Sequence, residues 1–477
     1  MTLKVHNTLS RELQTFESIE EGKVRLYACG PTIYDYAHIG NYRSFLFYDL
    51  VHRYLEWSGY DVDFVMNLTD VDDKTIQAAL REGTDIRSYT EPYGEAVLGD
   101  AEILGVRPAD RYPRATDCVE EMIDFVKRLV EKGHAYQADD GAVYFSIATF
   151  PRYGELKGID VSTLRSGARV AQDEYEKEDA RDFVLWKAAT EDDEEAGAAW
   201  DSPWGRGRPG WHLECSVMSV TELGSTLDLH LGGEDLVFPH HENEIAQSEA
   251  ATGKPFVRYW LHVKHLLVEG KKMSKSLGNF ITVRELLDEG YDPASIRHQL
   301  LSAQYRRELN FTRDGLDASR NAVQRLVDFE SRLADTPTDE GAEPAGLAAA
   351  AETFLDRFRA ALDDDFNSAD GMGALFSFVG TVNGALDGRD AVGAEELQSA
   401  RDALASGDEV LGILETARRA RAVAPETVAW IEERIEARAR ARAERDFEAA
   451  DAIREELADQ GIVLEDGAGG TRWKVTT

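Results

Sequence analysis

The sequence predicts an α/β protein, in which a Rossmann-like parallel-sheet domain is split by an insertion and followed by an all-α helical bundle and a small C-terminal α+β module. Strand and helix patterns alternate over residues 23–71 and again from residue 228, as in a parallel sheet covered by helices. Beyond residue 310 the chain has helical periodicity and is rich in Ala, Arg and Glu, and it ends on two short strand patterns. These observations together predict the fold class.

The chain has 477 residues, of which 43% are hydrophobic, so it can bury several cores. We expect one domain at residues 1–80 and 201–310, an inserted domain at 81–200, a helical bundle at 311–420 and a terminal module at 421–477. No apolar run approaches the roughly 20 residues that span a bilayer, and the N-terminus lacks a basic stretch followed by an apolar one. A soluble, cytoplasmic protein is therefore expected.

The first elements form a strand, a helix and a second strand. Residues 23–30 alternate apolar side chains and end at Gly30, which predicts a strand. Residues 42–60 carry apolar side chains at helical spacing and close at Gly59, and residues 61–71 again have a strand pattern. This order is the repeating unit of a parallel sheet, whose ligands bind where strands end.

The middle of the chain interrupts the alternation and then resumes it. Helical segments and acidic loops, among them residues 189–200, predict an insertion. The alternation returns with a strand at 228–235, a helix from Pro239 to about Thr252 and strands around 263–270. These later elements are expected to complete the sheet.

The C-terminal third is predicted to contain a flexible linker and a separate small module. Residues 334–352 are rich in Ala, Gly, Pro and acidic residues, which predicts the linker. Near the end, one helical stripe carries Phe447, Ala450, Ile453 and Leu457, and a Gly-rich turn joins two short strand patterns.

The charge balance is strongly acidic, with 53 Lys and Arg against 89 Asp and Glu, a formal net charge of −36. Such a surface opposes phosphate binding and repels itself. Molar salt removes the self-repulsion, because the Debye length falls to about 3 Å at 1 M. We therefore expect a halophilic source, the alternative being an ordinary acidic cytosolic enzyme.

Two short motifs suit a nucleotide triphosphate. His38, Gly40 and Asn41 lie where the first strand leads into the first helix, so backbone amides there can bind phosphate, and the His and Asn side chains can donate hydrogen bonds. Lys272, Ser274 and Lys275 lie in GKKMSKSLGN, a Gly/Ser-rich loop directly after a strand pattern, where flexible ammonium groups suit a leaving pyrophosphate. The alternatives are a solvated histidine and a solvated basic loop.

The sequence also contains a candidate metal site. The chain has only 3 cysteines, too few for a disulfide framework; Cys118 is expected to be a small buried apolar side chain. Cys29 and Cys215 are candidate thiolate ligands, and His240 and Glu244 have the i, i+4 spacing that places both on one helix face. Two thiolates, an imidazole and a carboxylate form a plausible zinc shell. The alternative is core thiols, with either His240 or the adjacent histidine on the surface.

The two nucleotide motifs resemble the HIGH and KMSKS signatures of class I aminoacyl-tRNA synthetases. Around the candidate ligands, YACGPTIYDYAHIG, GRPGWHLECS and LGGEDLVFPHHENE resemble motifs of cysteinyl-tRNA synthetases. The resemblance implies that ATP, with Mg²⁺, activates L-cysteine to an adenylate that is passed to the 3′ end of tRNA(Cys). It also implies that Cys29, Cys215, His240 and Glu244 hold one zinc ion with a position for the substrate thiolate. At Asn41 the signature calls for a second histidine.

Other site residues follow from the same resemblance. Gly232, Gly233 and Asp235 lie at a strand end, where the carboxylate suits the ribose of ATP, although a plain acidic turn is the alternative. Thr69 and Trp211 match positions that line the amino-acid pocket. The C-terminal helices resemble an anticodon-binding bundle, and Trp473 beside Arg472 is a candidate to stack on a base; the alternative is a solvated helix face and a tryptophan packed on its own hairpin.

Zinc coordination offers a physical route to substrate choice. A hydrophobic pocket separates side chains as similar as those of cysteine and serine by only about 10- to 200-fold, whereas a thiolate on zinc is a contact that a hydroxyl does not reproduce. Two other functions fit part of the sequence: a tRNA-independent cysteine:amino-sugar ligase, which has no use for the helical C-terminal third, and a non-catalytic RNA-binding or regulatory relative, which has no use for the lysines and ligands.

Overall fold

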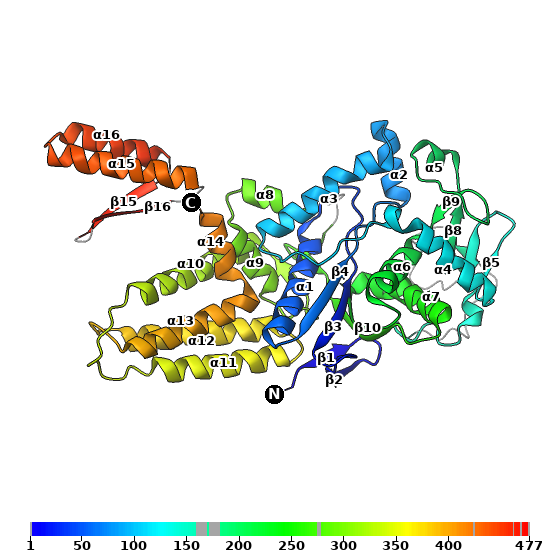
Figure 1. Ribbon diagram of the computed structural model, residues 1–477, viewed down its shortest axis with the longest axis horizontal. Helices are drawn as coiled ribbons and strands as arrows, with labels where there is room; N and C mark the ends of the chain where they lie inside the picture. The colour runs from blue at the N-terminus through cyan, green and yellow to red at the C-terminus, as the bar shows by residue number, and fades with distance from the viewer. Residues whose placement is uncertain are drawn as a thin grey trace. The chain divides into compact units, whose positions relative to one another are not determined.

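The computed structural model describes residues 2–158, 169–170, 182–273, 278–422, 425–460, 462–467 and 470–475. The chain divides into two compact units, Met1–Thr416 and Ala417–Thr477 (Figure 1). No helix among these residues is long and apolar enough to cross a membrane.

A parallel sheet of four strands lies at the centre of the first unit (Figure 1). Its strand order is β11-β10-β3-β4, with bounds Val257–Val263, Leu227–Gly233, Lys23–Ala28 and Asp61–Met66. β3 pairs in parallel with β10 on one side and with β4 on the other. The predicted parallel sheet, completed after the insertion, is confirmed. A short antiparallel hairpin, β1 (Lys4–Asn7) and β2 (Glu12–Thr15), precedes it.

Helix α1 (Ile39–Trp57) connects β3 to β4 and begins three residues before its predicted start. The first turn of the helix contains a capping box, in which His38 is the N-cap residue and Asn41 its partner. The sequence pattern missed this turn because its polar residues do not continue the apolar periodicity. On the other side of the sheet lie α6 (Trp211–Leu223), which precedes β10 in the chain, and α7 (Glu242–Thr252), which precedes β11 (Figure 1).

The predicted helix at Pro239 is only partly correct. A π-helical turn spans Val237–His241, and Phe238 within it has non-helical angles, so the regular helix α7 begins at Glu242 and ends at the predicted Thr252. Gly253, in the left-handed conformation at φ 72°, ends it.

The interrupting segment contains a sheet that the sequence pattern did not predict. Its helices are α2 (Asp73–Glu82), α3 (Ile86–Ile103), α4 (Val119–Glu131) and α5 (Glu191–Glu195). Its strands are β5 (Ala135–Gln137), β6 (Val143–Phe145), β7 (Arg169–Val170), β8 (Asp182–Ala188) and β9 (Gly207–Pro209). Two 3-10 turns lie at Ala115–Cys118 and Ile147–Thr149. Four of these strands have two or three residues and are too short to show alternation, and β8, which has seven, is a nearly continuous buried run without alternation. The predicted acidic loop at 189–200 contains α5, which Thr190 caps.

The inserted elements share a hydrophobic core with the flanking domain. Phe125, Val143 and Leu185 of the insertion pack in one cluster with Leu213 of α6 and Ala246 of α7. The segment after α3 also returns to the central sheet, where the Asp110 backbone N–H donates to the Phe64 carbonyl at 2.9 Å.

After the sheet, a smaller three-stranded sheet leads into the helical bundle. Its strands are β13 (Lys271–Lys272), β12 (Leu266–Val268) and β14 (Leu309–Phe311), and between them lie α8 (Val283–Asp288) and α9 (Pro293–Leu301). The bundle consists of α10 (Arg313–Asp335), α11 (Leu347–Asp363), α12 (Ser368–Leu386), α13 (Ala394–Leu411) and α14 (Ile413–Arg421), which continues into the second unit.

The predicted linker at 334–352 is only partly correct. Its last residues belong to α11, which begins at Leu347. The remainder is tied to the loop and helix near α13, because the Asp339 N–H donates to the Val392 carbonyl at 3.0 Å and the Glu396 carboxylate accepts from Ala345 and Gly346 N–H at 2.7 and 2.9 Å.

The second unit contains α15 (Pro425–Ala443), α16 (Phe447–Asp459) and the hairpin β15 (Ile462–Gly467) and β16 (Gly470–Val475). Its core joins Ile431 and Leu457 to Ile462 and Leu464 of the hairpin. Phe447, predicted on the buried stripe, is 62% exposed because it is the first residue of α16 and lies beyond that core.

Candidate metal centre and nucleotide site

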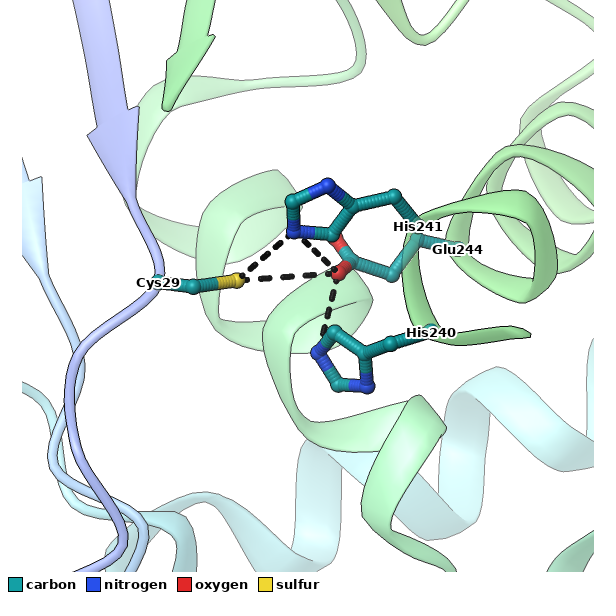
Figure 2. Close-up of side chains that lie close together, drawn as sticks. All are labelled: Cys29, His240, His241 and Glu244. Carbon is teal, nitrogen blue, oxygen red and sulfur yellow. Dashed lines mark hydrogen bonds and ion pairs between the residues drawn. The ribbon is translucent and has the colours of Figure 1, made fainter. Parts of the chain in front are cut away.

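Five potential metal ligands converge at the carboxyl end of β3. Cys29 directly follows that strand, Cys215 lies in α6, His240 and His241 lie in the π-helical turn, and Glu244 lies in the first turn of α7. All are at least 95% buried. Figure 2 shows the Cys29 sulfur pointing toward His241 and Glu244, with His240 approaching the same carboxylate from the other side.

The distances within this group suit a tetrahedral ion. The Cys29 Sγ atom lies 3.6 Å from Cys215 Sγ and 3.7 Å from Glu244 Oε1, and Glu244 Oε1 lies 3.1 Å from His240 Nε2. Zinc–sulfur bonds of about 2.3 Å place the two sulfurs of a tetrahedral shell about 3.8 Å apart. One ligand atom each from Cys29, His240, His241 and Glu244 lies within 4.8 Å of the others. The donor set therefore fits zinc.

The site stabilises charged ligand forms despite its burial. A hydrogen bond from the Cys29 thiol lowers the pKa of Cys215 to about 6. Burial acts in the opposite direction, and His240 lowers the pKa further. Burial alone would raise the pKa of Glu244, but His230 and His240 lower it to about 2. Burial together with the neighbouring Cys215 raises the pKa of Cys29. Burial alone would lower the pKa of His240, but Glu244 and Cys215 raise it to about 10, so a protonated His240 balances these groups until a metal cation replaces its proton.

A second layer of histidines orients the ligands. His241 Nδ1 lies 2.7 Å from His262 Nε2, and His230 Nε2 lies 2.9 Å from Glu244 Oε2. His212 Nδ1 lies 3.0 Å from His240 Nδ1. Hydrogen bonds to the far side of a ligand fix its rotamer and tune its basicity.

Gly232 allows the imidazole of His241 to approach the sheet. A Cβ atom at Gly232 would lie 2.3 Å from His241 Cε1, closer than any van der Waals contact allows. Gly232 is also a predicted nucleotide-binding residue, and its lack of a side chain accommodates His241 in addition to that predicted role.

The two residues predicted for the amino-acid pocket lie beside this group. The Trp211 ring lies over His240, with centroids 4.3 Å apart. The Thr69 hydroxyl donates to Glu214 at 3.0 Å and accepts from Asn67 Nδ2 at 3.1 Å, and Asn67 Oδ1 lies 3.6 Å from the Cys215 sulfur. Trp211 therefore contacts the candidate ligand His240 directly, and Thr69 is connected to the candidate ligand Cys215 through Asn67.

The first nucleotide motif caps α1. His38 Nδ1 accepts from the Asn41 N–H at 3.2 Å, and Asn41 Oδ1 accepts from the His38 N–H at 3.1 Å. The reciprocal bonds fix both side chains at the helix N-terminus, where the helix dipole favours an anion. The Asn41 oxygen accepts within the cap, and the amide nitrogen, the only donor of that side chain, is the atom available to serve as the predicted phosphate donor.

The second motif lies against the first. A Cβ atom at Gly40 would come within 3.1 Å of Met273 Cε, and the Ile39 N–H donates to the Ile281 carbonyl at 2.9 Å. Lys272, at the end of β13, is exposed. Ser274 and Lys275 lie outside the described residues. The signatures, more than 230 residues apart in the chain, are therefore neighbours.

The predicted adenosine residues lie on the turn after β10. Gly233 is the N-cap of a 3-10 turn, Glu234–Leu236, that contains the exposed Asp235. Burial raises the pKa of Tyr48 in α1, and charges at Cys29 and Asp235 raise it further, so Tyr48 lies near both the metal group and this turn. The side chain of Trp473 lies outside the described residues; its backbone pairs with Leu464 in the terminal hairpin.

His241 is the ligand candidate that the sequence interpretation missed. The i, i+4 rule selects His240 over its neighbour, but the π-helical turn brings His241 Nε2 within 3.3 Å of the Cys29 sulfur and 3.8 Å of Glu244 Oε1. The adjacent pair of histidines was the available signal. Cys118 is half-buried at the N-cap of α4 and is not part of the group.

Comparisons with known proteins agree with this architecture. Residues 15–321 match the model of the tRNA synthetases class I (C) catalytic domain, residues 357–415 the DALR domain, and residues 418–473 the cysteinyl-tRNA ligase anticodon binding domain. The fold is similar to that of methionyl-tRNA synthetase from Mycobacterium tuberculosis in complex with methionyl-adenylate, with a TM-score of 0.60 at 16% identity over 83% of this chain and 91% of that one.

Full-length relatives share almost half of the sequence. A cysteine–tRNA ligase of Solibacter usitatus is 47% identical, and one of Chlamydia trachomatis serovar A is 45% identical; each comparison covers 99% of this chain and 100% of the relative. The chain belongs to the cysteine–tRNA ligase family of class I aminoacyl-tRNA synthetases.

Proposed function

We propose that the chain activates L-cysteine with ATP and transfers it to the 3′ end of tRNA(Cys), selecting cysteine at a zinc ion held by Cys29, Cys215, His240 and Glu244. The observation that carries this proposal is the buried group of two sulfurs, an imidazole and a carboxylate at the end of β3. A bound zinc ion would supply a Lewis-acidic position that binds a thiolate in preference to a hydroxyl. His241 is an additional donor to the same site.

The chain's own residues position the reactants. The capped N-terminus of α1, with His38, Gly40 and Asn41, binds phosphate, and Asp235 with Gly233 binds the adenosine. Trp211 and Thr69 line the amino-acid pocket. Lys272, Ser274 and Lys275 stabilise the charge that grows on the leaving pyrophosphate, to which Mg²⁺ also binds. The carboxylate of cysteine is then in place to attack the α-phosphate.

The C-terminal parts receive the tRNA. We assign residues 1–80 and 201–310 to the catalytic domain, 81–200 to the insertion, 311–420 to the helical bundle and 421–477 to the tRNA-binding module, in which Trp473 is a candidate base contact. The match to an anticodon binding domain favours tRNA as acceptor over the tRNA-independent amino-sugar ligase. The net charge of −36 favours a halophilic source. A cytoplasmic location remains an expectation from the sequence.

Pyrophosphate exchange tests this proposal. The purified chain, incubated with ATP and labelled pyrophosphate, should incorporate label with cysteine and not with serine, and tRNA(Cys) should accept the activated cysteine. Exchange that is equal with serine would contradict selection at the metal, and exchange without charging of tRNA would favour the amino-sugar ligase. Activity that rises from low to molar KCl would support the salt-adapted source.

A further inference from the structure

A cluster of tyrosines lies beside the nucleotide site. The rings of Tyr36 and Tyr93 meet edge to face with centroids 5.4 Å apart, and the centroid of Tyr89 lies 5.3 Å from that of Tyr93. The Tyr89 hydroxyl donates to the Tyr34 carbonyl at 2.9 Å, which joins α3 to the loop before α1. Tyr36 precedes the cap residue His38 by two positions, and 44% of its surface is exposed.

Arg284 holds the Tyr36 ring in place. Its guanidinium lies 4.7 Å from the centroid of that ring and pairs with the buried Asp100 of α3 at 3.0 Å. Asp100 also accepts from the Tyr42 hydroxyl at 3.5 Å. Arg284 lies in α8, two residues after Thr282, whose backbone bridges to His38. An exposed aromatic ring is therefore held between α3 and α8, next to the first signature motif.

We propose that Tyr36, supported by Tyr93 and Arg284, is a stacking platform for an unpaired base at the 3′ end of the tRNA. The proposal rests on the proposed function, because that reaction brings a single-stranded 3′ end to the residues beside His38. Unpaired bases of RNA bind proteins by stacking on aromatic rings and on arginine. A chain of net charge −36 gains little from phosphate attraction, so stacking is the contact best suited to this surface.

A pair of substitutions at Tyr36 tests the platform. Tyr36→Leu should lower kcat/KM for tRNA about 10- to 100-fold, the range expected for one stacked base, while Tyr36→Phe retains most of it. Neither should change cysteine-dependent pyrophosphate exchange. With 2-aminopurine in place of the 3′-terminal adenine, binding to the wild type and to Tyr36→Phe should quench its fluorescence, and binding to Tyr36→Leu should not. The matched control is Tyr291→Leu, because Tyr291 is also a tyrosine with an arginine over its ring: Arg320 lies 4.8 Å from the ring centroid.

The outcomes separate the platform from the proposed function. Normal charging and normal quenching by Tyr36→Leu would overturn the platform while the proposed function stands. An equal loss of exchange and charging would also overturn it, because Tyr36 would then act on the adenylate. A wild-type chain without cysteine-dependent exchange would overturn the proposed function itself, and the platform with it.

Discussion

The molecule buries two polar clusters that differ in how their atoms are satisfied. In the first, the Asp49 carboxylate of α1 accepts from Arg53 Nε at 2.9 Å, Arg297 Nη2 at 2.5 Å and the Arg107 N–H at 2.9 Å. Burial alone would raise the pKa of Asp49, but Arg297 and Arg53 hold it below its ordinary value. The guanidiniums also donate to backbone carbonyls, among them that of Gly105 at 2.8 and 3.0 Å. Arg53 Nη1 also donates to Glu415 Oε2 at 2.8 Å, so two carboxylates balance two guanidiniums and the cluster neutralises itself.

The cluster around Cys29 is arranged differently. Its sulfur, nitrogen and carboxylate atoms face one another at separations of 3.1 to 3.7 Å, and the histidines behind them hold them in that arrangement. Donors that converge in this way are suited to an ion, whereas the Asp49 cluster is complete without one. The comparison indicates that a closed buried network stabilises the fold and a convergent one binds a ligand. Four substitutions, in order of expected effect, test this distinction.

Cys215→Ser should abolish function with little change of fold. A serine hydroxyl is a poor zinc ligand, so the metal content should fall from about one ion per chain towards zero. Loss of a hydrogen bond that supports a ligand costs up to about 100-fold in activity. Loss of the ligand itself should therefore lower cysteine-dependent exchange by more than about 100-fold. Metal analysis and pyrophosphate exchange measure the two quantities. Cys118→Ser is the control and should retain both. Full metal content in Cys215→Ser would remove Cys215 from the ligand set.

Asp49→Asn should instead destabilise the fold and leave the metal bound. Removing one charge from a buried ion network costs about 3–5 kcal/mol, because Arg53 and Arg297 stay buried without full compensation. The urea midpoint of unfolding should fall, with metal content unchanged. In the exposed pair of Arg206 and Glu194, whose side chains are 47% and 44% exposed, Glu194→Gln should change the midpoint little. Equal midpoints for the two variants would contradict a stabilising role for the buried network.

His298 tests whether a buried histidine outside both clusters acts through burial alone. Burial lowers the pKa of His298 from 6.5 to about 4. Because the folded chain favours the neutral imidazole, its stabilising effect is complete above pH 6.5 and is lost as the pH falls from 6.5 to about 4. Over that range the wild type should lose about 3 kcal/mol more free energy of unfolding than His298→Gln. Urea unfolding at several pH values measures this, with and without chelator.

The control for this experiment is His265→Gln, at a histidine whose side chain is 50% exposed. It should retain the pH dependence of the wild type. A chelator that changes the effect of His298→Gln would show that the histidine is coupled to the metal after all.

Gly232→Ala should weaken metal binding without changing any of the four proposed ligands, Cys29, Cys215, His240 and Glu244. The new methyl group would displace His241, whose Cε1 atom lies 2.3 Å from the Cβ position, and displaced supporting groups cost about 10- to 100-fold in metal affinity. Competition with a chromophoric chelator measures the affinity. Gly99→Ala, where a Cβ atom meets nothing within 4 Å, should have no effect. Unchanged affinity in Gly232→Ala would exclude His241 from the support of the site.

Local pattern predicts those parts of the fold that are determined locally. β3, α1 and β4 were predicted because their periodicity is regular and glycines end two of them. The candidate ligands were predicted from their chemistry, the i, i+4 spacing and the family motifs, and the structure brings all four together. Missed features depend on context. Most strands of the insertion are too short for alternation, and β8 is buried along five successive residues. The π-helical turn that brings His241 inward breaks the helical spacing.

Long-range pairing left no trace in the sequence. Arg297 and Asp49 are 248 residues apart, and neither lies in a motif that marks it as half of a buried ion pair. Tyr36 lies within the family motif YACGPTIYDYAHIG, but the motif does not show its surroundings, because its role depends on Tyr93 and Arg284 from two helices far along the chain. Such residues are identified only when the fold places them together.

The central claim, that the cluster around Cys29 binds a metal that recognises the substrate thiol, is tested most directly by the spectrum of the cobalt-substituted protein. The two cysteine ligands should give a sulfur-to-metal charge-transfer band, which should grow and shift when cysteine is added and should not respond to serine. A cobalt spectrum that cysteine leaves unchanged, in protein that still activates cysteine, would show the metal to be structural and would contradict the claim.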